Sequence, residues 1–208
     1  MYYTSQDIKS MNRVNRIKVI NSVTGIKSAN LIGTVSNTGE TNVAVFSSIV
    51  HLGSNPALLG FILRPTAEIP RHTYSNINEN GYYTINHVHP GFTDKAHYTS
   101  AKFDKEISEF DRCGLTEEYI ADFKAPFVLE SQFKMGMKFK EAINIRLNGT
   151  ILVIGEIEHL IIPEKAFINE DIDLEQTNSV GISGLNSYYE LKKIARYPYA
   201  RVTEAPDF

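Results

Sequence analysis

The sequence has no tryptophan and only one cysteine, Cys113. A single cysteine cannot form a disulfide within the chain, and a chain without a disulfide framework is typical of a reducing compartment. With 208 residues the protein is long enough to bury a core that needs neither disulfides nor a structural metal. We therefore expect one domain over residues 1–208, located in the cytoplasm.

The sequence also lacks a strong excess of charge and long apolar runs. Its 21 lysines and arginines nearly balance 24 aspartates and glutamates, which gives a net charge of −3. This balance disfavours nucleic acid and anionic membranes as partners. No apolar run approaches the roughly 20 residues of a transmembrane helix, and the first residues do not resemble a signal peptide. We expect a protein that binds neither membrane nor nucleic acid.

Several catalytic motifs are missing. The chain contains no Gly-x-Gly-x-x-Gly turn, no phosphate loop ending in Gly-Lys-Ser/Thr, no His-Glu-x-x-His and no Gly-x-Ser-x-Gly. His87 and His89 stand two residues apart at a predicted strand end, but no cysteine or carboxylate cluster has a matching spacing, so we expect no metal site. Cys113 follows Arg112, which would lower the pKa of its thiol, but a structural cysteine at a helix end is the favoured interpretation.

Short apolar, β-branched segments separated by turn residues dominate the remainder. They predict strands over residues 31–36, 42–50, 58–63, 82–88, 127–134, 136–147 and 150–162, the last two joined at Asn148-Gly149. Helical spacing predicts helices over residues 5–20, 66–80 and 104–112, and a short helix within residues 180–191. The part from about residue 165 to 208 is expected to be a C-terminal extension. The pattern indicates a mainly β protein, an antiparallel barrel with a few short helices.

Hydroxyl and cationic side chains gather at the ends of the predicted strands. Ser47 and Ser48 interrupt one strand, Arg64 ends another, and Arg71 precedes Thr73 at the following helix. Hydroxyls, cations and the amides of a helix start are the groups that bind a phosphate monoester. Alternatively, the serines satisfy a bulge and Arg64 is a solvated strand end. The 11 tyrosines and 11 phenylalanines are likewise compatible with core packing or with a flat, conjugated ligand.

These segments resemble the flavin reductase-like family of FMN-binding split-barrel proteins, which includes flavoredoxin. The resemblance covers about residues 20 to 200 and depends on the order of short elements: Asn42 to Ser48, Ser54 to Leu58, Arg64-Pro65, Thr73 to Ile77, Tyr83 to Asn86, and Gly114 to Thr116. It implies a split β-barrel with Greek-key topology, non-covalently bound FMN and a homodimer. The aromatic pair Tyr188-Tyr189 is expected to cover the flavin of the neighbouring subunit.

Carried over position by position, the resemblance implies a set of flavin contacts. It assigns the ribityl chain and phosphate to Ser47, Ser48, Ile49, Arg64 and Thr73, with Lys27 as a second cation. It also places Ser28, Ala29, Asn30 and Leu31 along the ring edge and Asn86 near the pocket. The sequence departs from the family pattern where Lys27 replaces an arginine, because lysine carries the charge without the bidentate fork.

The activity implied by the resemblance is that of an oxidoreductase. Its FMN accepts a hydride from NADH or NADPH and passes electrons to an acceptor that the sequence does not identify. Because the cofactor supplies the reactive chemistry, no acid–base triad is needed, and no catalytic side chain is assigned. A flavin-binding electron carrier or store without nicotinamide activity is the alternative. A haem or pyridoxal-phosphate split barrel is a third interpretation, and its absorption spectrum would distinguish it.

Overall fold

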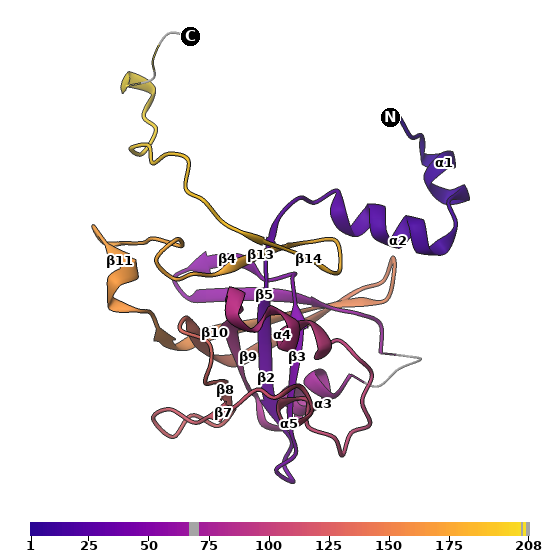
Figure 1. Ribbon diagram of the computed structural model, residues 1–208, viewed down its shortest axis with the longest axis vertical. Helices are drawn as coiled ribbons and strands as arrows, with labels where there is room; N and C mark the ends of the chain where they lie inside the picture. Colours follow the sequence, from indigo (N-terminus) through magenta and orange to yellow (C-terminus); the bar gives the residue numbers. More distant parts are fainter. Residues whose placement is uncertain (67–70, 205, 207–208) are drawn as a thin grey trace.

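Antiparallel strands are the main regular structure of the computed structural model, which describes residues 1–66, 71–204 and 206 (Figure 1). Seven of them make one sheet in the order β3-β2-β6-β9-β10-β5-β4. Their bounds are β2 Asn30–Val35, β3 Thr41–Phe46, β4 Val50–Ser54, β5 Ala57–Leu63, β6 Tyr82–His87, β9 Lys134–Ile145 and β10 Thr150–Ile161. Strands distant in sequence are neighbours, such as β5 beside β10 and β2 beside β6. This is a Greek-key arrangement, as expected.

The sheet closes around an apolar core that takes side chains from β2, β5, β6, β9 and β10, with Phe46 of β3 packed against it. Phe61 lies at its centre, with ring centroids 5.1 Å from Phe46 and 5.7 Å from Tyr83 in edge-to-face contacts. The two edge strands of the sheet, β3 and β4, are not paired with each other among the described residues, which leaves the barrel split between them. Next to this split, Ser48 Oγ accepts from the Ile62 N–H at 3.0 Å and donates to the Ile62 carbonyl at 3.2 Å, and so extends the β4–β5 pairing beyond Val50.

Most predicted strands are confirmed, but two have different limits. The strand predicted over residues 42–50 ends at Phe46, and β4 begins separately at Val50 because the chain turns across the split. Of the strand predicted over residues 127–134, only Phe127–Val128 forms β8, which pairs with β7 Glu117–Glu118. The turn at Asn148-Gly149 is longer than two residues, because Thr150 pairs with Ile145.

The predicted helix over residues 5–20 is wrong as one element. It is two helices, α1 Ser5–Ser10 and α2 Arg13–Ser22. Thr4 and Asp7 form a capping box that starts α1, and the Asn12 side chain accepts from the Asn15 N–H at 2.9 Å and starts α2. The second N-cap, Asn12, lies within the predicted helix and starts a new one there, which breaks the element in two. Neither helix buries a residue.

The helices around the barrel are short. α3 His72–Asn80 ends at Gly81 in the left-handed conformation, and residues 67–70 of its predicted span lie outside the described residues. α5 Glu109–Cys113 is shorter than the predicted 104–112, and α4 Thr93–Tyr98 was not predicted. The described residues also contain three 3-10 turns: η1 Pro90–Phe92, η2 Glu164–Ala166 and η3 Val202–Glu204. No helix in the described ranges has the length and apolar character needed to cross a bilayer.

The helix predicted within residues 180–191 is a hairpin. β13 Val180–Ser183 pairs with β14 Ser187–Glu190 and with β1 Lys27–Ser28, and a small pair, β11 Phe167–Ile168 with β12 Asp171–Ile172, precedes it. Val180 and Ile182 both face the core, which is a period of two. Tyr188 packs against this same core, and its hydroxyl lies 3.3 Å from His97 Nδ1, so that ring has a partner within its own chain.

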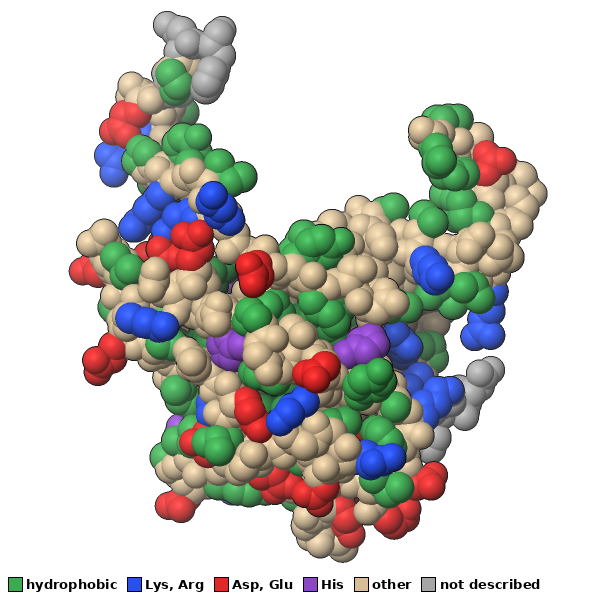
Figure 2. All heavy atoms as spheres, in the orientation of Figure 1, with side chains coloured by type: hydrophobic (Ala, Val, Ile, Leu, Met, Phe, Trp, Pro, Cys, Tyr) green, Lys and Arg blue, Asp and Glu red, His purple; other side chains and the backbone are tan. Residues whose placement is uncertain are grey.

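Both ends of the chain leave the body of the molecule. Helices α1 and α2 and the segment after β14 extend from the same side of the barrel (Figure 1), and both expose hydrophobic side chains (Figure 2). Residues 191–201 have no regular secondary structure. The predicted C-terminal extension therefore consists of a part that packs on the barrel, through β13 and β14, and a part that does not.

Candidate functional site

A cleft of about 520 Å³ opens at the split of the barrel. One wall is the end of β3 with the adjoining Ser47 and Ser48, and another is the end of β5 continued by Arg64. The start of α3 and the segment from Thr99 to Lys105 complete the lining, with Glu109 also contributing. Ala44, Val45, Phe46, Ile62 and Leu63 give the cleft an apolar side, whereas its α3 end is cationic. Such a division suits a ligand with a flat apolar part and a charged end.

Among the described residues, no carboxylate forms an ion pair with Arg71 at the cationic end of the cleft. Arg71 is the N-cap of α3, whose first turn receives no side-chain cap. Its buried Nε has no hydrogen-bond partner among the described residues. Burial, and then the charge of Arg64, lower the pKa of the Arg71 guanidinium. A buried donor left without an acceptor costs free energy. An anion at this helix start would accept from the Arg71 Nε and offset the neighbouring positive charges of Arg64 and Arg71, as a phosphate does.

The hydroxyl groups near the cationic end have different partners. Thr73 Oγ1 accepts from Asn42 Nδ2 at 3.1 Å, which leaves its proton available to a ligand in the cleft. Ser48 Oγ is occupied by the backbone of Ile62. Ser47 precedes it and lines the cleft directly. The structure thus brings together Ser47, Ser48, Arg64 and Thr73 in the lining of the cleft, as the sequence predicted. Ser48 also hydrogen-bonds the backbone of Ile62 in β5.

The other predicted contacts lie outside the cleft lining. Lys27 Nζ donates to the Asn21 carbonyl at 2.7 Å and to Thr24 Oγ1 at 3.1 Å, so its charge is directed to the end of α2. Ser28 belongs to β1, and Ile49 packs partly buried against the barrel core. The contacts of these residues with a flavin stay predictions.

Ala29, Asn30, Leu31 and Asn86 are buried. Asn86 Nδ2 donates to the Leu31 carbonyl at 3.2 Å, and its Oδ1 accepts from the Val128 N–H at 3.0 Å. The Asn86 side chain therefore joins β2 and β6 to the segment at β8. Asn30 Nδ2 donates to Ser28 Oγ at 2.9 Å, whereas its Oδ1 has no partner within the described ranges. Flavin contacts of these four residues also stay predictions.

Several lining residues were not assigned a contact from the sequence. Arg71 and His72 are two of them: the sequence places both inside a helix predicted over residues 66–80, whereas α3 begins at His72, directly after Arg71. Glu109 is another: its carboxylate accepts from the Val43 N–H of edge strand β3 at 3.3 Å, and burial raises its pKa. The segment from Thr99 to Lys105 is the third contribution. The sequence assigns no flavin contact to it, because irregular segments are positioned by tertiary contacts.

His87 and His89, at the end of β6, hydrogen-bond residues that are distant in the sequence. His89 Nε2 accepts from the Gln132 N–H at 2.8 Å, and its Nδ1 donates to the Asn178 carbonyl at 3.0 Å, so neither nitrogen is free for a metal. His87 Nδ1 lies 2.8 Å from Ser179 Oγ, and burial lowers the pKa of His87 to about 4. Among the described residues, no group of three potential ligands that could hold a metal ion occurs.

Cys113 lies at the end of α5 and is partly exposed. Burial, and then the charge of Glu109, raise the pKa of its thiol, and this outweighs the opposite effect of Arg112. A raised pKa keeps the sulfur protonated and unreactive. The interpretation of Cys113 as a structural residue therefore agrees with its surroundings better than that of an activated thiol.

Comparison with known proteins identifies relatives of the whole fold. A family profile described as "flavin reductase like domain" matches residues 24–174. A candidate flavin reductase with a split barrel domain from Shewanella frigidimarina NCIMB 400 is 47% identical, with a TM-score of 0.92 over 96% of this chain and 100% of that one. The 2-nitrobenzoate 2-nitroreductase of Pseudomonas fluorescens shares the fold at 18% identity, with a TM-score of 0.82 over 100% and 99% of the two chains. An FMN-binding domain of a flavin reductase-like enzyme from Shewanella baltica OS155 does so at 16% identity, with a TM-score of 0.68 over 83% and 90%.

Proposed function

The chain belongs to the flavin reductase-like family, and on that premise we propose that it is an oxidoreductase that binds FMN non-covalently in the cleft and oxidises NADH or NADPH. The observation that carries the proposal is the buried Arg71 Nε without a partner among the described residues, beside Arg64 and the uncapped start of α3. This arrangement favours a flavin with a terminal phosphate over riboflavin.

Each part of the cleft lining contributes to FMN binding in this proposal. When bound, FMN supplies hydride and electron transfer, which no side chain of the protein can perform. Arg64 and Arg71 hold the phosphate by charge-assisted hydrogen bonds, and Thr73 donates its hydroxyl. Phe46, Ile62 and Leu63 exclude water from the apolar side. The Glu109 carboxylate holds edge strand β3 through the Val43 N–H and so fixes that wall.

We further propose that the protein acts in the cytoplasm as a homodimer and passes its electrons to an acceptor protein or small molecule. The hydrophobic surface of the two projecting ends supports the dimer (Figure 2). The single, partly exposed Cys113 supports a reducing compartment.

An anaerobic titration tests the central proposal. Protein purified without added cofactor is expected to be yellow, to release FMN on denaturation, and to lose its visible flavin absorbance when NADH or NADPH is added. Bound FMN that neither donor reduces would identify a flavin carrier or store instead. A haem or pyridoxal-phosphate spectrum would overturn the proposal altogether.

A further inference from the structure

A second, smaller pocket of about 330 Å³ lies between α4 and α5, beside the segment that lines the flavin cleft. Its lining consists of Asp94, Lys95, Tyr98, Phe103, Arg112 and Cys113. Phe103 lines the cleft as well, so its side chain borders both cavities. The second pocket therefore adjoins the cleft at Phe103.

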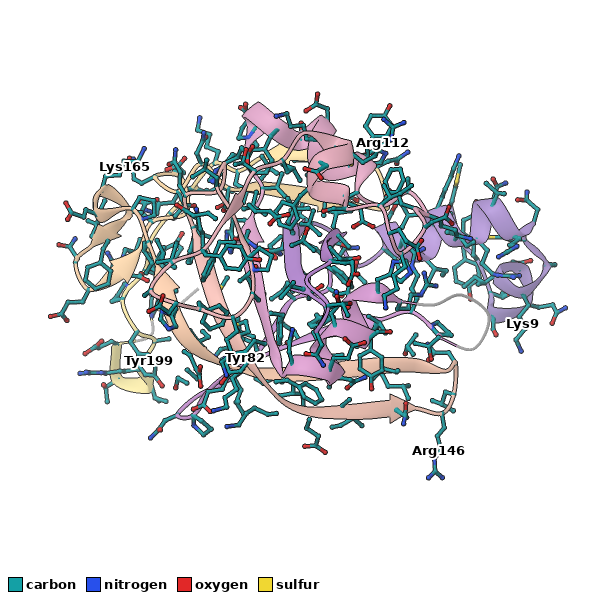
Figure 3. The ribbon with its side chains drawn as sticks, turned by 90° about the horizontal axis from the view of Figure 1, so that it is seen from below. Lys9, Tyr82, Arg112, Arg146, Lys165 and Tyr199 are labelled. Carbon is teal, nitrogen blue, oxygen red and sulfur yellow. The ribbon has the colours of Figure 1, made fainter. Side chains whose placement is uncertain are left out.

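The pocket has aromatic, cationic and acceptor groups in one place. Tyr98 is 66% exposed and, with the partly buried Phe103, offers ring surface for stacking. Arg112 is exposed at the surface of α5 (Figure 3), and the ion pairs within the described part of the chain do not include it. Lys95 Nζ donates to the Gly114 carbonyl at 2.6 Å and so ties α4 to the end of α5. The Asp94 carboxylate is an acceptor for hydroxyl groups.

We propose that this pocket binds the adenosine phosphate half of the dinucleotide that reduces the flavin. Tyr98 and Phe103 would stack on the base, Arg112 would bind phosphate, and Asp94 would accept from ribose hydroxyls. The inference rests on the proposed function, because the nicotinamide must enter the cleft while the other half of the dinucleotide lies outside it. Because Phe103 lines both cavities, the second pocket is next to the cleft and is the site we assign to the adenosine phosphate half.

Comparison of two donors tests the inference through activity. NADH and NADPH contain the adenosine half, whereas reduced nicotinamide mononucleotide lacks it. Arg112→Ala is expected to raise the KM for the better dinucleotide roughly tenfold, the loss of one charge-assisted contact, and to leave the KM for the mononucleotide unchanged. Arg146→Ala is the matched control, because Arg146 lies on the distant β9–β10 connection (Figure 3) and should affect neither donor. Equal KM values for wild type and Arg112→Ala, or an equal rise for both donors, would overturn the inference.

A binding measurement gives a second test that needs no activity. ADP-ribose, which carries only the adenosine diphosphate and ribose part, is titrated calorimetrically into the FMN-loaded protein. Binding to wild type and to Arg146→Ala, with at least tenfold weaker binding to Arg112→Ala and to Tyr98→Leu, supports the pocket. Absence of binding to wild type, or unchanged binding to both pocket variants, overturns it. If neither NADH nor NADPH is oxidised but ADP-ribose binds in this manner, the proposed function fails and the pocket stands.

Discussion

Arg64 and Arg71 place two guanidinium groups at the start of α3, where burial and the charge of Arg64 make the charged form of Arg71 less favourable. In the absence of an anion, the Arg71 Nε has no acceptor among the described residues. A phosphate reverses both effects, since it supplies acceptors and negative charge. The selectivity of the cleft for FMN over riboflavin should therefore reside in these two side chains.

Replacement of Arg64 by alanine is expected to weaken FMN binding by about 1.5–3 kcal/mol, or roughly 10- to 150-fold in Kd, because one charge-assisted contact is lost. Riboflavin has no phosphate, so its Kd should be the same for wild type and variant. Arg71→Ala should behave in the same way. Quenching of flavin fluorescence measures both ligands in one format. A variant that weakens riboflavin as much as FMN would show that the phosphate lies elsewhere.

The buried His87 should make the free energy of unfolding depend on pH. Burial lowers the pKa of His87 to about 4 in the folded protein, below the ordinary value of about 6.5 for histidine, so the unfolded chain binds a proton more readily. Its contribution to stability is therefore complete above pH 6.5 and is lost as the pH falls from 6.5 towards 4, by an amount on the order of 3 kcal/mol. Burial also lowers the pKa of His89, which adds a loss of the same sign.

Urea unfolding at several pH values between 7.5 and 4.5 measures this loss. His87→Asn should flatten the dependence of the free energy of unfolding on pH, since the titrating group is gone. The exposed His51 provides the matched control, and His51→Asn should keep the wild-type slope. If His87→Asn keeps the full slope, the acid sensitivity belongs to other groups.

Among the elements, strands were more predictable than the segments between them. The helix prediction near the C-terminus failed because the alternation of buried residues there, Val180 and Ile182, is too short to be recognised. The segment is a strand because it pairs with Lys27 and Ser28, which are distant in the sequence. The β2–β3 hairpin was predictable because its apolar pattern and turn are local.

The candidate site was predictable only in part, for a related reason. Ser47, Ser48, Arg64 and Thr73 stand next to predicted strands or helices, and the structure brings all four to the cleft. Its remaining wall, from Thr99 to Lys105, is irregular. Tertiary contacts position such a segment, and residue periodicity does not reveal them.

Ser48 extends the pairing of β4 with β5 beyond the end of their ladder. β4 pairs with β5 from Val50 opposite Gly60, and Ser48 continues that contact with its side chain, through the N–H and carbonyl of Ile62. Ser48→Ala is expected to reduce the free energy of unfolding of the flavin-free protein by about 1–3 kcal/mol, because both Ile62 groups lose their side-chain partner.

The neighbouring Ser47 is the matched control for this change, since it lines the cleft. Ser47→Ala should change the free energy of unfolding by less than about 0.5 kcal/mol and weaken FMN binding instead. Urea denaturation of the two flavin-free variants separates the effects. Equal destabilisation by both substitutions would mean that the hydrogen bonds from Ser48 to Ile62 do not stabilise the fold.

At the scale of the whole molecule, both ends of the chain leave large apolar side chains in water (Figure 2). Helix α2 buries no residue, and Val14 on it is 59% exposed. Beyond β14, Ile194 is 99% exposed, and Tyr197 and Tyr199 are exposed at 84% and 86%. Hydrophobic surface that is gathered on two projecting segments is typical of an interface between subunits. We therefore expect the two ends to pack against a second copy of the chain.

Sedimentation velocity at micromolar concentration is expected to give the mass of a dimer with FMN bound. Ile194→Ser combined with Tyr197→Ser should raise the dimer dissociation constant by tenfold or more, because each large side chain buried in an interface contributes roughly 1.5–3 kcal/mol. Leu147→Ser is the matched control: Leu147 is 98% exposed but lies on the β9–β10 connection, so its replacement should leave the dimer unchanged. The substitutions lie outside the barrel core, so the free energy of unfolding of the monomeric fold should be unaffected. A monomeric wild-type mass with FMN still bound would contradict the prediction and would mean that the projecting ends serve another partner.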